Sequence, residues 1–426
     1  MARENCWRPL ESVINQFKLR GSWGELGNQN TSNLYPFYEI LPVKSNSGNW
    51  LVNGGKTNTA DIPSLVSTLL TWERVRSFNV GFDFGAFSNR LTGSFDYFVR
   101  KTVDMVGPAP QLPLVLGIAP AIVNNADMKS YGFEIELSWR DRIGEVDYGV
   151  KFNLADAQQK VVKYPNTTNA FSDWYAGKMS GEIWGYTSLG IAKTDEEMKE
   201  HLASLPNGGQ NQLGNKWGAG DIMYADINGD GKVDGGKGTL ADPGDQRIIG
   251  NSTPRYNFGL VLDASYKGFD VSIFFQGVGK RDYAPIVGTN GAVFWGAVNN
   301  IWQSMAMEEH FDYFRPEGHP MGANLNGYYP RPDFTSNKNH QVQTRYLQDA
   351  SYIRLKNLQI GYTLPKQWIN KLHINRCRVY VSGDNLWTGT SLASMFDPET
   401  LAAGDWGSGK TYPLSKVISF GLNVNF

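Results

Sequence analysis

Strict alternation of apolar and polar residues recurs in ten separate stretches of this chain, and this pattern restricts the fold more than any other feature. In residues 76–85, Phe78, Val80, Phe82 and Phe84 alternate with small or polar residues such as Asp83. Side chains of a β-strand point alternately to opposite faces, so a period of two predicts strands with one apolar and one polar face. The other stretches lie at about 17–26, 91–100, 131–139, 146–155, 256–266, 268–277, 352–364, 376–387 and 418–426.

The stretch at 352–364 contains one interruption of this pattern. Its apolar phase shifts between Leu355 and Leu358. A single extra residue in one strand produces such a shift, because it moves every later side chain to the other face. The sequence therefore predicts a bulge or bend at this point.

The connections between the predicted strands alternate strictly in length. The short ones lie near 86–90, 140–145, 267 and 365–375, and the long ones near 27–75, 101–130, 156–255, 278–351 and 388–415. Outer-membrane barrels have tight periplasmic turns and long outer loops, and a tilted strand crosses the bilayer in about 9–11 residues. The sequence therefore predicts an all-β fold of antiparallel transmembrane strands, with long extracellular loops and Phe426 on the periplasmic side.

Composition supports a β-rich chain and excludes several other classes. Only 41% of residues are hydrophobic, 13% are aromatic and 47 are glycine. No apolar run reaches the roughly 18 residues of a membrane helix. A net charge of −1 gives no basic excess for nucleic acid. The cysteines, Cys6 and Cys377, are too few for a disulfide framework.

Eight stretches resemble one known family, in an order and spacing that cover essentially the whole chain. The chain is similar to the C-terminal half of the SusC/RagA-type TonB-linked outer-membrane transporters of Bacteroidetes. The matching stretches are FKLRGSWGELGNQN (17–30), TWERVRSFNVGFDFGAFSNRLTGSFDYFVRKTVDM (71–105), NNADMKSYGFEIELSW (124–139), GDIMYADINGDGKVD (220–234), RIIGNSTPRYNFGL (247–260), RYLQDASYIRLKNLQIGYTLP (345–365), VYVSGDNLW (379–387) and YPLSKVISFGLNVNF (412–426).

This resemblance implies a fold and a function. It implies a barrel of about 22 strands, of which this chain supplies the last ten or so. It also implies import of oligosaccharides or peptides through the outer membrane, together with a SusD-type surface lipoprotein and the TonB complex. Residues 1–426 contain no recognisable signal peptide, TonB-contacting segment, plug or first strands. We therefore expect the chain to be a C-terminal part of a receptor that is not competent for transport alone.

The clearest candidate for a metal-binding motif lies at 226–234. Asp226, Asn228, Asp230 and Asp234 occupy positions 1, 3, 5 and 9 of a calcium-loop pattern, Gly follows Asp230 at position 6, and the Lys232 carbonyl stands at position 7. Position 12 is a lysine, so the acidic ligand is expected further on, at Asp242 or Asp245, and the family pattern favours Asp245. The residues predict bound Ca²⁺; the alternative is an Asn-Gly and Asp-Gly turn with solvated carboxylates.

Aromatic residues in the long loops are the other candidate contacts. Stacking on a sugar face is one use of an exposed indole, although loop cores and membrane interfaces also use tryptophan. The candidates for substrate contact are Trp174, Trp217, Trp295 and Trp406.

We expect no enzyme, because no nucleophile elbow or nucleotide-binding glycine loop is present. Glu134 and Glu136 are two residues apart on a polar strand face, which indicates a solvated lumen wall. The competing hypothesis is a secreted β-rich protein that binds carbohydrate or acts in adhesion through a calcium loop. Such a protein should not direct a band of large apolar residues to solvent on every strand. The barrel instead places this band against outer-membrane lipid.

Overall fold

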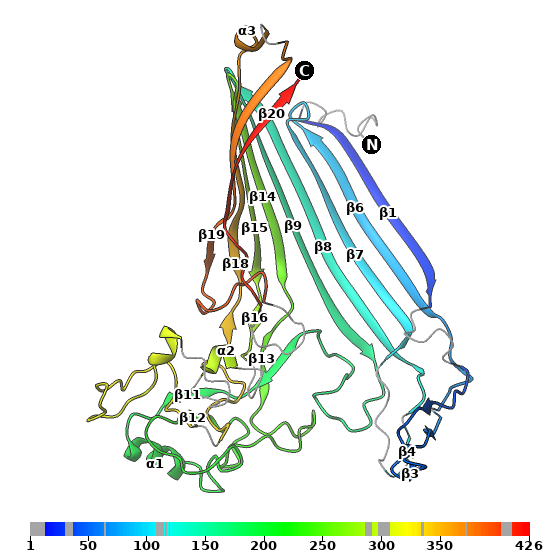
Figure 1. Ribbon diagram of the computed structural model, residues 1–426, viewed down its shortest axis with the longest axis vertical. Helices are drawn as coiled ribbons and strands as arrows, with labels where there is room; N and C mark the ends of the chain where they lie inside the picture. The colour runs from blue at the N-terminus through cyan, green and yellow to red at the C-terminus, as the bar shows by residue number, and fades with distance from the viewer. Residues whose placement is uncertain are drawn as a thin grey trace.

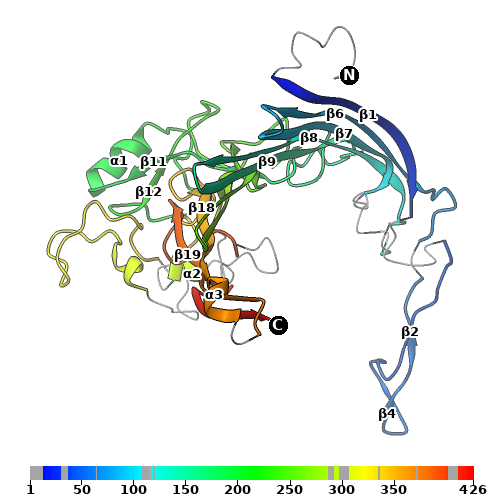
Figure 2. The ribbon, with the colours of Figure 1, turned by 90° about the horizontal axis from the view of Figure 1, so that it is seen from above.

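A single ten-stranded antiparallel sheet dominates the structure. The computed structural model describes residues 13–29, 37–63, 65–107, 115, 117–118, 120–285, 292–296, 307–333, 336–370, 373–401 and 411–426. Each strand of the sheet lies beside its neighbours in the chain, and the sheet curves into an open trough (Figures 1 and 2). Its strands are β1 (Ile14–Asn28), β6 (Glu73–Ala86), β7 (Leu91–Val106), β8 (Asn124–Ile143), β9 (Val146–Lys163), β14 (Arg255–Tyr266), β15 (Phe269–Lys280), β18 (Tyr352–Thr363), β19 (Arg376–Thr390) and β20 (Val417–Asn425).

All ten predicted strands and the alternation of their connections are confirmed. The short turns at 87–90, 144–145 and 267–268, and the segment that contains α3 (Lys366–Ile369), lie at the end of the sheet that also carries the C-terminus (Figure 1). The long connections gather at the opposite end. Hairpins of this kind keep neighbouring strands adjacent, as antiparallel barrels require.

The two faces of the sheet differ in polarity as the alternation predicts. On one face large apolar side chains stand open to the surroundings; Phe78 is 48% exposed and Phe420 is 84% exposed. On the other face Arg20 of β1 forms ion pairs with Asp83 of β6 at 2.9 Å and Asp96 of β7 at 2.7 Å. An apolar outside and a polar, charged inside are the arrangement of a transmembrane barrel.

The predicted interruption in 352–364 is a bulge. Leu355 pairs with Trp387, but the next pair is Asn357 with Asp384, so Lys356 and two residues of β19 are inserted. One of these inserted residues, Asn385, has a left-handed φ of 53°. Asparagine tolerates this conformation better than most residues. The bulge therefore explains the shift of apolar phase between Leu355 and Leu358.

Short elements occur inside the long connections. The connection before β6 holds β2 (Val43–Lys44), β3 (Leu51–Val52), β4 (Gly55–Lys56) and β5 (Thr59–Ala60). The two longest connections hold β10 (Glu182–Gly185), β11 (Ser188–Ile191), α1 (Asp195–Ala203), β12 (Ile222–Tyr224), β13 (Arg247–Asn251), β16 (Asp282–Tyr283), α2 (Ala292–Trp295), a 3₁₀ turn at Glu308–Phe311 and β17 (Gln348–Asp349).

The helix α1 begins where the sequence provides a cap. Thr194 accepts a hydrogen bond from the Glu197 backbone N–H, and three acidic residues fill the first turn. Both features stabilise the positive end of a helix dipole. Among the described residues, no helix has the length and apolar character needed to cross a membrane.

Substitution of two neighbouring residues of β8 tests which face of the sheet meets lipid. Ile135 is on the apolar face near the middle of the band from Tyr131 to Trp139, and Glu134 is on the polar face. We expect Ile135→Arg to lower the free energy of unfolding by about 2–4 kcal/mol, the cost of arginine near the bilayer midplane. The matched Glu134→Arg variant should change it little. Urea unfolding of the receptor in phospholipid vesicles measures both, and equal effects would contradict the assignment of faces.

Candidate functional site

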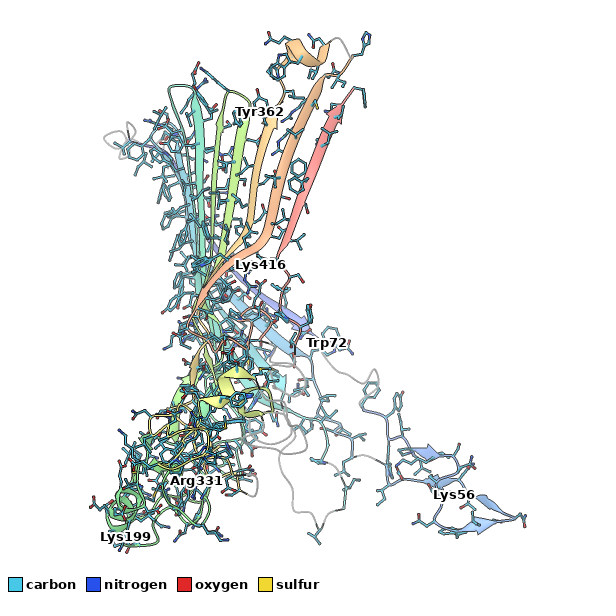
Figure 3. All side chains as sticks on the ribbon, turned by 60° about the vertical axis from the view of Figure 1, so that its left-hand side comes forward. Lys56, Trp72, Lys199, Arg331, Tyr362 and Lys416 are labelled. Atoms are coloured by element: carbon cyan, nitrogen blue, oxygen red, sulfur yellow. The ribbon has the colours of Figure 1, made fainter. Side chains whose placement is uncertain are left out.

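The long connections between β9 and β14 and between β15 and β18, together with the start of the connection after β19, fold into one assembly, which we call the loop assembly. It comprises the described parts of 164–254, 281–351 and 391–401, and it lies beyond the end of the sheet where Lys199 and Arg331 are marked (Figure 3). Burial of large side chains from all three segments gives the assembly an apolar core of its own. The core consists of Tyr186, Leu205, Ile222, Tyr224, Val233, Val293, Phe294, Trp295, Tyr329, Tyr346, Ala350, Leu392, Phe396 and Leu401.

A fully buried carboxylate, Asp221, connects two of these segments. Arg331 donates to both of its oxygens, at 2.8 and 2.6 Å. The ammonium of Lys338, only 1% exposed, lies 3.0 Å from the same carboxylate. Asn339 donates a further bond at 2.9 Å. Such a carboxylate is tolerated only with several charged and polar partners, so it fixes the relative positions of residues more than 100 apart in the chain.

Strand β12 is held by a second buried network. Gln210 donates to the Ile222 carbonyl at 2.8 Å and accepts from the Tyr224 backbone N–H at 3.1 Å. The Tyr224 hydroxyl donates to the Lys338 carbonyl at 2.6 Å. Burial raises the pKa of this tyrosine well above its ordinary value. Because β12 ends two residues before Asp226, the acidic loop starts from a rigid support.

The acidic loop folds around hydrogen bonds from its own backbone. Asp226 accepts from the N–H groups of Gly229 and Gly231, at 2.6 and 2.8 Å. Asp230 accepts from the Lys232 N–H at 3.1 Å. Gly231 has a φ of +80°, which explains why glycine stands at this position. Asn228 accepts from the Asp230 N–H at 3.0 Å.

Asp245 closes this loop from a distant position. It is fully buried and accepts backbone bonds from Ile227 at 2.7 Å and from Asp234 at 2.8 Å. Burial raises the pKa of its carboxyl group. Sequence reasoning connected Asp245 with the acidic loop, and the structure does bring them together.

The acidic loop contains a cationic side chain of its own, Lys232. Its ammonium lies 2.5 Å from Asp234, and this contact holds the pKa of the Asp234 carboxyl below its usual value. Within the ranges that the structure describes, no group of three or more His, Cys, Asp or Glu side chains is arranged to hold a metal ion. The present arrangement therefore does not fit Ca²⁺, and binding would require Lys232 to leave and the carboxylates to converge. Calcium binding stays a prediction.

The four candidate tryptophans have different surroundings. Trp295 is 1% exposed and packs edge-on against Tyr346, which gives it a place in the core. Trp217 lies under the Lys338 ammonium, 4.9 Å from its ring centre. Trp174 is half-buried beside Tyr164, and Trp406 lies outside the described residues. Trp174 is therefore the described candidate that is least involved in holding the loop assembly together. Substrate contact by these residues stays a prediction.

One ion-pair cluster was not found by sequence reasoning. Arg354 of β18 is 3% exposed and bonds to Asp397 and Glu399, each at 2.7 Å. Lys356, the bulged residue, also bonds to Glu399 at 2.6 Å. These bonds hold the connection after β19 against β18. No local pattern marks them, because the partners are more than 40 residues apart.

Comparison with known proteins agrees with this architecture. The family of TonB-dependent receptor-like β-barrels matches residues 7–386. The TonB-dependent receptor P3 of Formosa agariphila is 28% identical over 456 aligned positions, covering 100% of this chain and 41% of the relative. The TonB-dependent receptor SusC of Bacteroides thetaiotaomicron is 21% identical over 431 positions, covering 97% of this chain and 38% of the relative.

Solved structures agree with the fold. The RagAB peptide transporter superposes with a TM-score of 0.71 at 24% identity, covering 97% of this chain and 41% of that chain. The architecture and the matches together define an outer-membrane β-barrel receptor and not an enzyme. The chain belongs to the family of TonB-dependent receptor-like β-barrels. It spans about two fifths of the length of the curated relatives that it matches.

Calcium binding can be tested through the competing ammonium. If Ca²⁺ binds, Lys232→Met should raise its affinity, because the variant removes the cation at Asp234. Asp230→Ala should abolish binding, because it removes a ligand. Isothermal titration of the folded receptor measures both. Absence of calcium-dependent heat in the wild type and in Lys232→Met would reject the site.

The loop assembly should lose stability in acid because of His340. This residue is fully buried, and its ring packs edge-on against Trp295. Burial lowers its pKa to about 4, with a smaller opposing effect from Asp333. Above pH 6.5, the ordinary pKa of histidine, the neutral ring of His340 does not reduce the stability of the fold. As the pH falls from 6.5 toward 4, the unfolded chain takes up a proton that the buried ring does not, so the free energy of unfolding decreases.

The free energy of unfolding should fall by at most about 1.4 kcal/mol per pH unit. Urea titration of tryptophan fluorescence between about pH 7 and pH 5 measures this loss. His340→Phe should reduce the pH dependence. An unchanged pH dependence in that variant would show that other groups cause the acid sensitivity.

Proposed function

We propose that this chain forms the closing wall and the outer loops of a TonB-dependent importer in the outer membrane. The observation that carries the proposal is the ten-stranded sheet, with its apolar outward face and all its long connections at one end. A receptor of this architecture moves its ligand through the barrel interior, driven from the inner membrane through TonB. The family match favours this function over a secreted adhesive protein.

The polar face of the sheet supports a transport path. A hollow of 650 Å³ lies against strands β6 to β15, and Asp83, Glu136 and Lys151 are among its lining residues. The side chains that surround it include charged, hydroxyl and amide groups, as the water-filled interior of a barrel requires. A ligand that carries many hydrogen-bonding groups, such as an oligosaccharide or a peptide, suits this surface.

We also propose that residues 1–426 are the C-terminal part of a longer receptor. Two observations support this. The curated relatives are more than twice as long as the part that aligns. In addition, β1 and β20 each have a single neighbour in the described sheet, and an unpaired strand edge within lipid costs several kcal/mol per unsatisfied group. The remaining part would supply the other strands, the plug and the TonB-contacting segment.

The loop assembly is the proposed meeting place for ligand and partner. It has its own core and buried ion pairs, so it presents a fixed surface at the barrel mouth. A SusD-type lipoprotein is the proposed partner there. The likeness to the RagAB peptide transporter supports a peptide as one ligand class. An oligosaccharide, which the family resemblance of the sequence also implies, is the other proposed class.

The experiment is uptake by cells that carry the full receptor or lack it. We expect loss of the receptor to stop growth on one class from a panel of oligosaccharides and peptides, and a protonophore to stop uptake by the wild type. Asp221→Ala should impair uptake while the barrel still assembles, because a broken buried ion pair destabilises the loop assembly by about 3–5 kcal/mol. Glu200→Gln, on the exposed face of α1, is the matched control. Normal growth of the deletion strain on every compound would contradict the proposal.

A further inference from the structure

Four basic residues stand in one straight row across four neighbouring strands. In the register of the sheet, Arg76 of β6 lies directly opposite Lys101 of β7. Lys101 lies opposite Lys129 of β8, and Lys129 lies opposite Lys160 of β9. Neighbouring strands are about 4.8 Å apart, so the three lysines span about 10 Å. We call Lys101, Lys129 and Lys160 the lysine row.

The lysine row is on the apolar, outward face of the sheet. Lys129 precedes Tyr131, Phe133 and Ile135 of the apolar band by multiples of two residues. Lys101 follows Val99 and Tyr97 of β7 in the same way. On β8 the row is therefore one step, about 7 Å along the strand, beyond Tyr131, the last aromatic residue of the band. On β9 the ion-paired Asp156 and the amide Gln158 are on the same face, between the apolar band and Lys160. It is on the side of the long loops, at the level where lipid headgroups meet the barrel.

The three ammonium groups are not neutralised by the part of the protein that the structure describes. Arg76, at the end of the row, is paired with Glu25 at 2.6 Å. In the described ranges no ion pair involves Lys101, Lys129 or Lys160. Lys101 and Lys160 are exposed, and Lys129 lies 5.1 Å from the centre of the Tyr131 ring.

The nearest acidic residues are engaged elsewhere. Asp104 is paired with Arg74 at 2.5 Å, and Asp127, further from the apolar band, accepts a backbone bond from Asp104. Asp156, on the other side of the row, is paired with Arg255. Like charges directly opposite on neighbouring strands repel each other. Three consecutive lysines in register therefore repel one another, and an external anion lying across them would remove this repulsion.

We propose that the lysine row binds the phosphate groups of an anionic lipid in the outer leaflet. A phosphorylated lipid fits because its acyl chains would lie on the apolar band while its headgroup reaches the ammonium groups directly above. The aromatic residue beneath the row is typical of the level of a membrane interface. Clusters of lysine beside a membrane-spanning segment attract anionic headgroups in the same way.

The experiment uses the full receptor that contains this chain, in nanodiscs of phosphatidylcholine with or without diphosphoryl lipid A. Lipid A should raise the unfolding temperature of the wild type. The triple variant Lys101→Gln, Lys129→Gln, Lys160→Gln should bind lipid A about a hundredfold more weakly, since each basic side chain at an anionic surface contributes roughly fivefold. In phosphatidylcholine alone the triple variant should be at least as stable as the wild type, because the repulsion within the row is gone.

A matched control has the same change of charge in the loop assembly. Lys193→Gln, Lys199→Gln, Lys237→Gln removes three exposed lysines far from the lysine row and should keep wild-type binding of lipid A. If both triple variants lost the same amount of lipid A binding, net charge alone would explain the effect and the proposal would be overturned. Wild-type binding by the row variant would overturn it too. Inorganic phosphate that stabilises the wild type as well as lipid A does would overturn the assignment to lipid.

Discussion

Within a bilayer every backbone N–H and C=O group needs a partner in the protein, because hydrocarbon offers none. The ten-stranded sheet meets this requirement by pairing each inner strand on both sides. Pairing also fixes the register, and the register decides which residues face lipid and which face the interior. The apolar band, the polar hollow, the ion pairs of Arg20 and the lysine row are all consequences of one register carried across the sheet.

The loop assembly obeys a different requirement. Outside the membrane, water can satisfy the backbone, so the long connections are not forced into strands. They are ordered instead by a core of large side chains and by buried charges such as Asp221 and Lys338. These buried charges stabilise less than their number suggests, because removing them from water costs nearly as much as their attraction returns. Their effect is to select one arrangement of the loop assembly, as the proposed role in ligand recognition requires.

The strands could be predicted from the sequence because their information is local. A period of two over 9–11 residues, and one shift of phase at Leu355 and Leu358, were enough to place the strands and the bulge. The loop assembly could not be predicted in the same way, since Arg331 and its partner Asp221 are 110 residues apart. The sequence associated Asp245 with the acidic loop, but it did not reveal the Lys232 ammonium at Asp234. It also gave no sign that Trp295 would be buried.

The central claim is that the long connections lie outside the cell and the short turns in the periplasm. Labelling of single cysteines in intact cells with a membrane-impermeant maleimide tests it most directly. In a receptor without Cys6 and Cys377, Lys199→Cys in α1 should react in intact cells, whereas Glu145→Cys in the turn between β8 and β9 should react only after the outer membrane is opened. Labelling of Glu145→Cys and not of Lys199→Cys in intact cells would contradict the account.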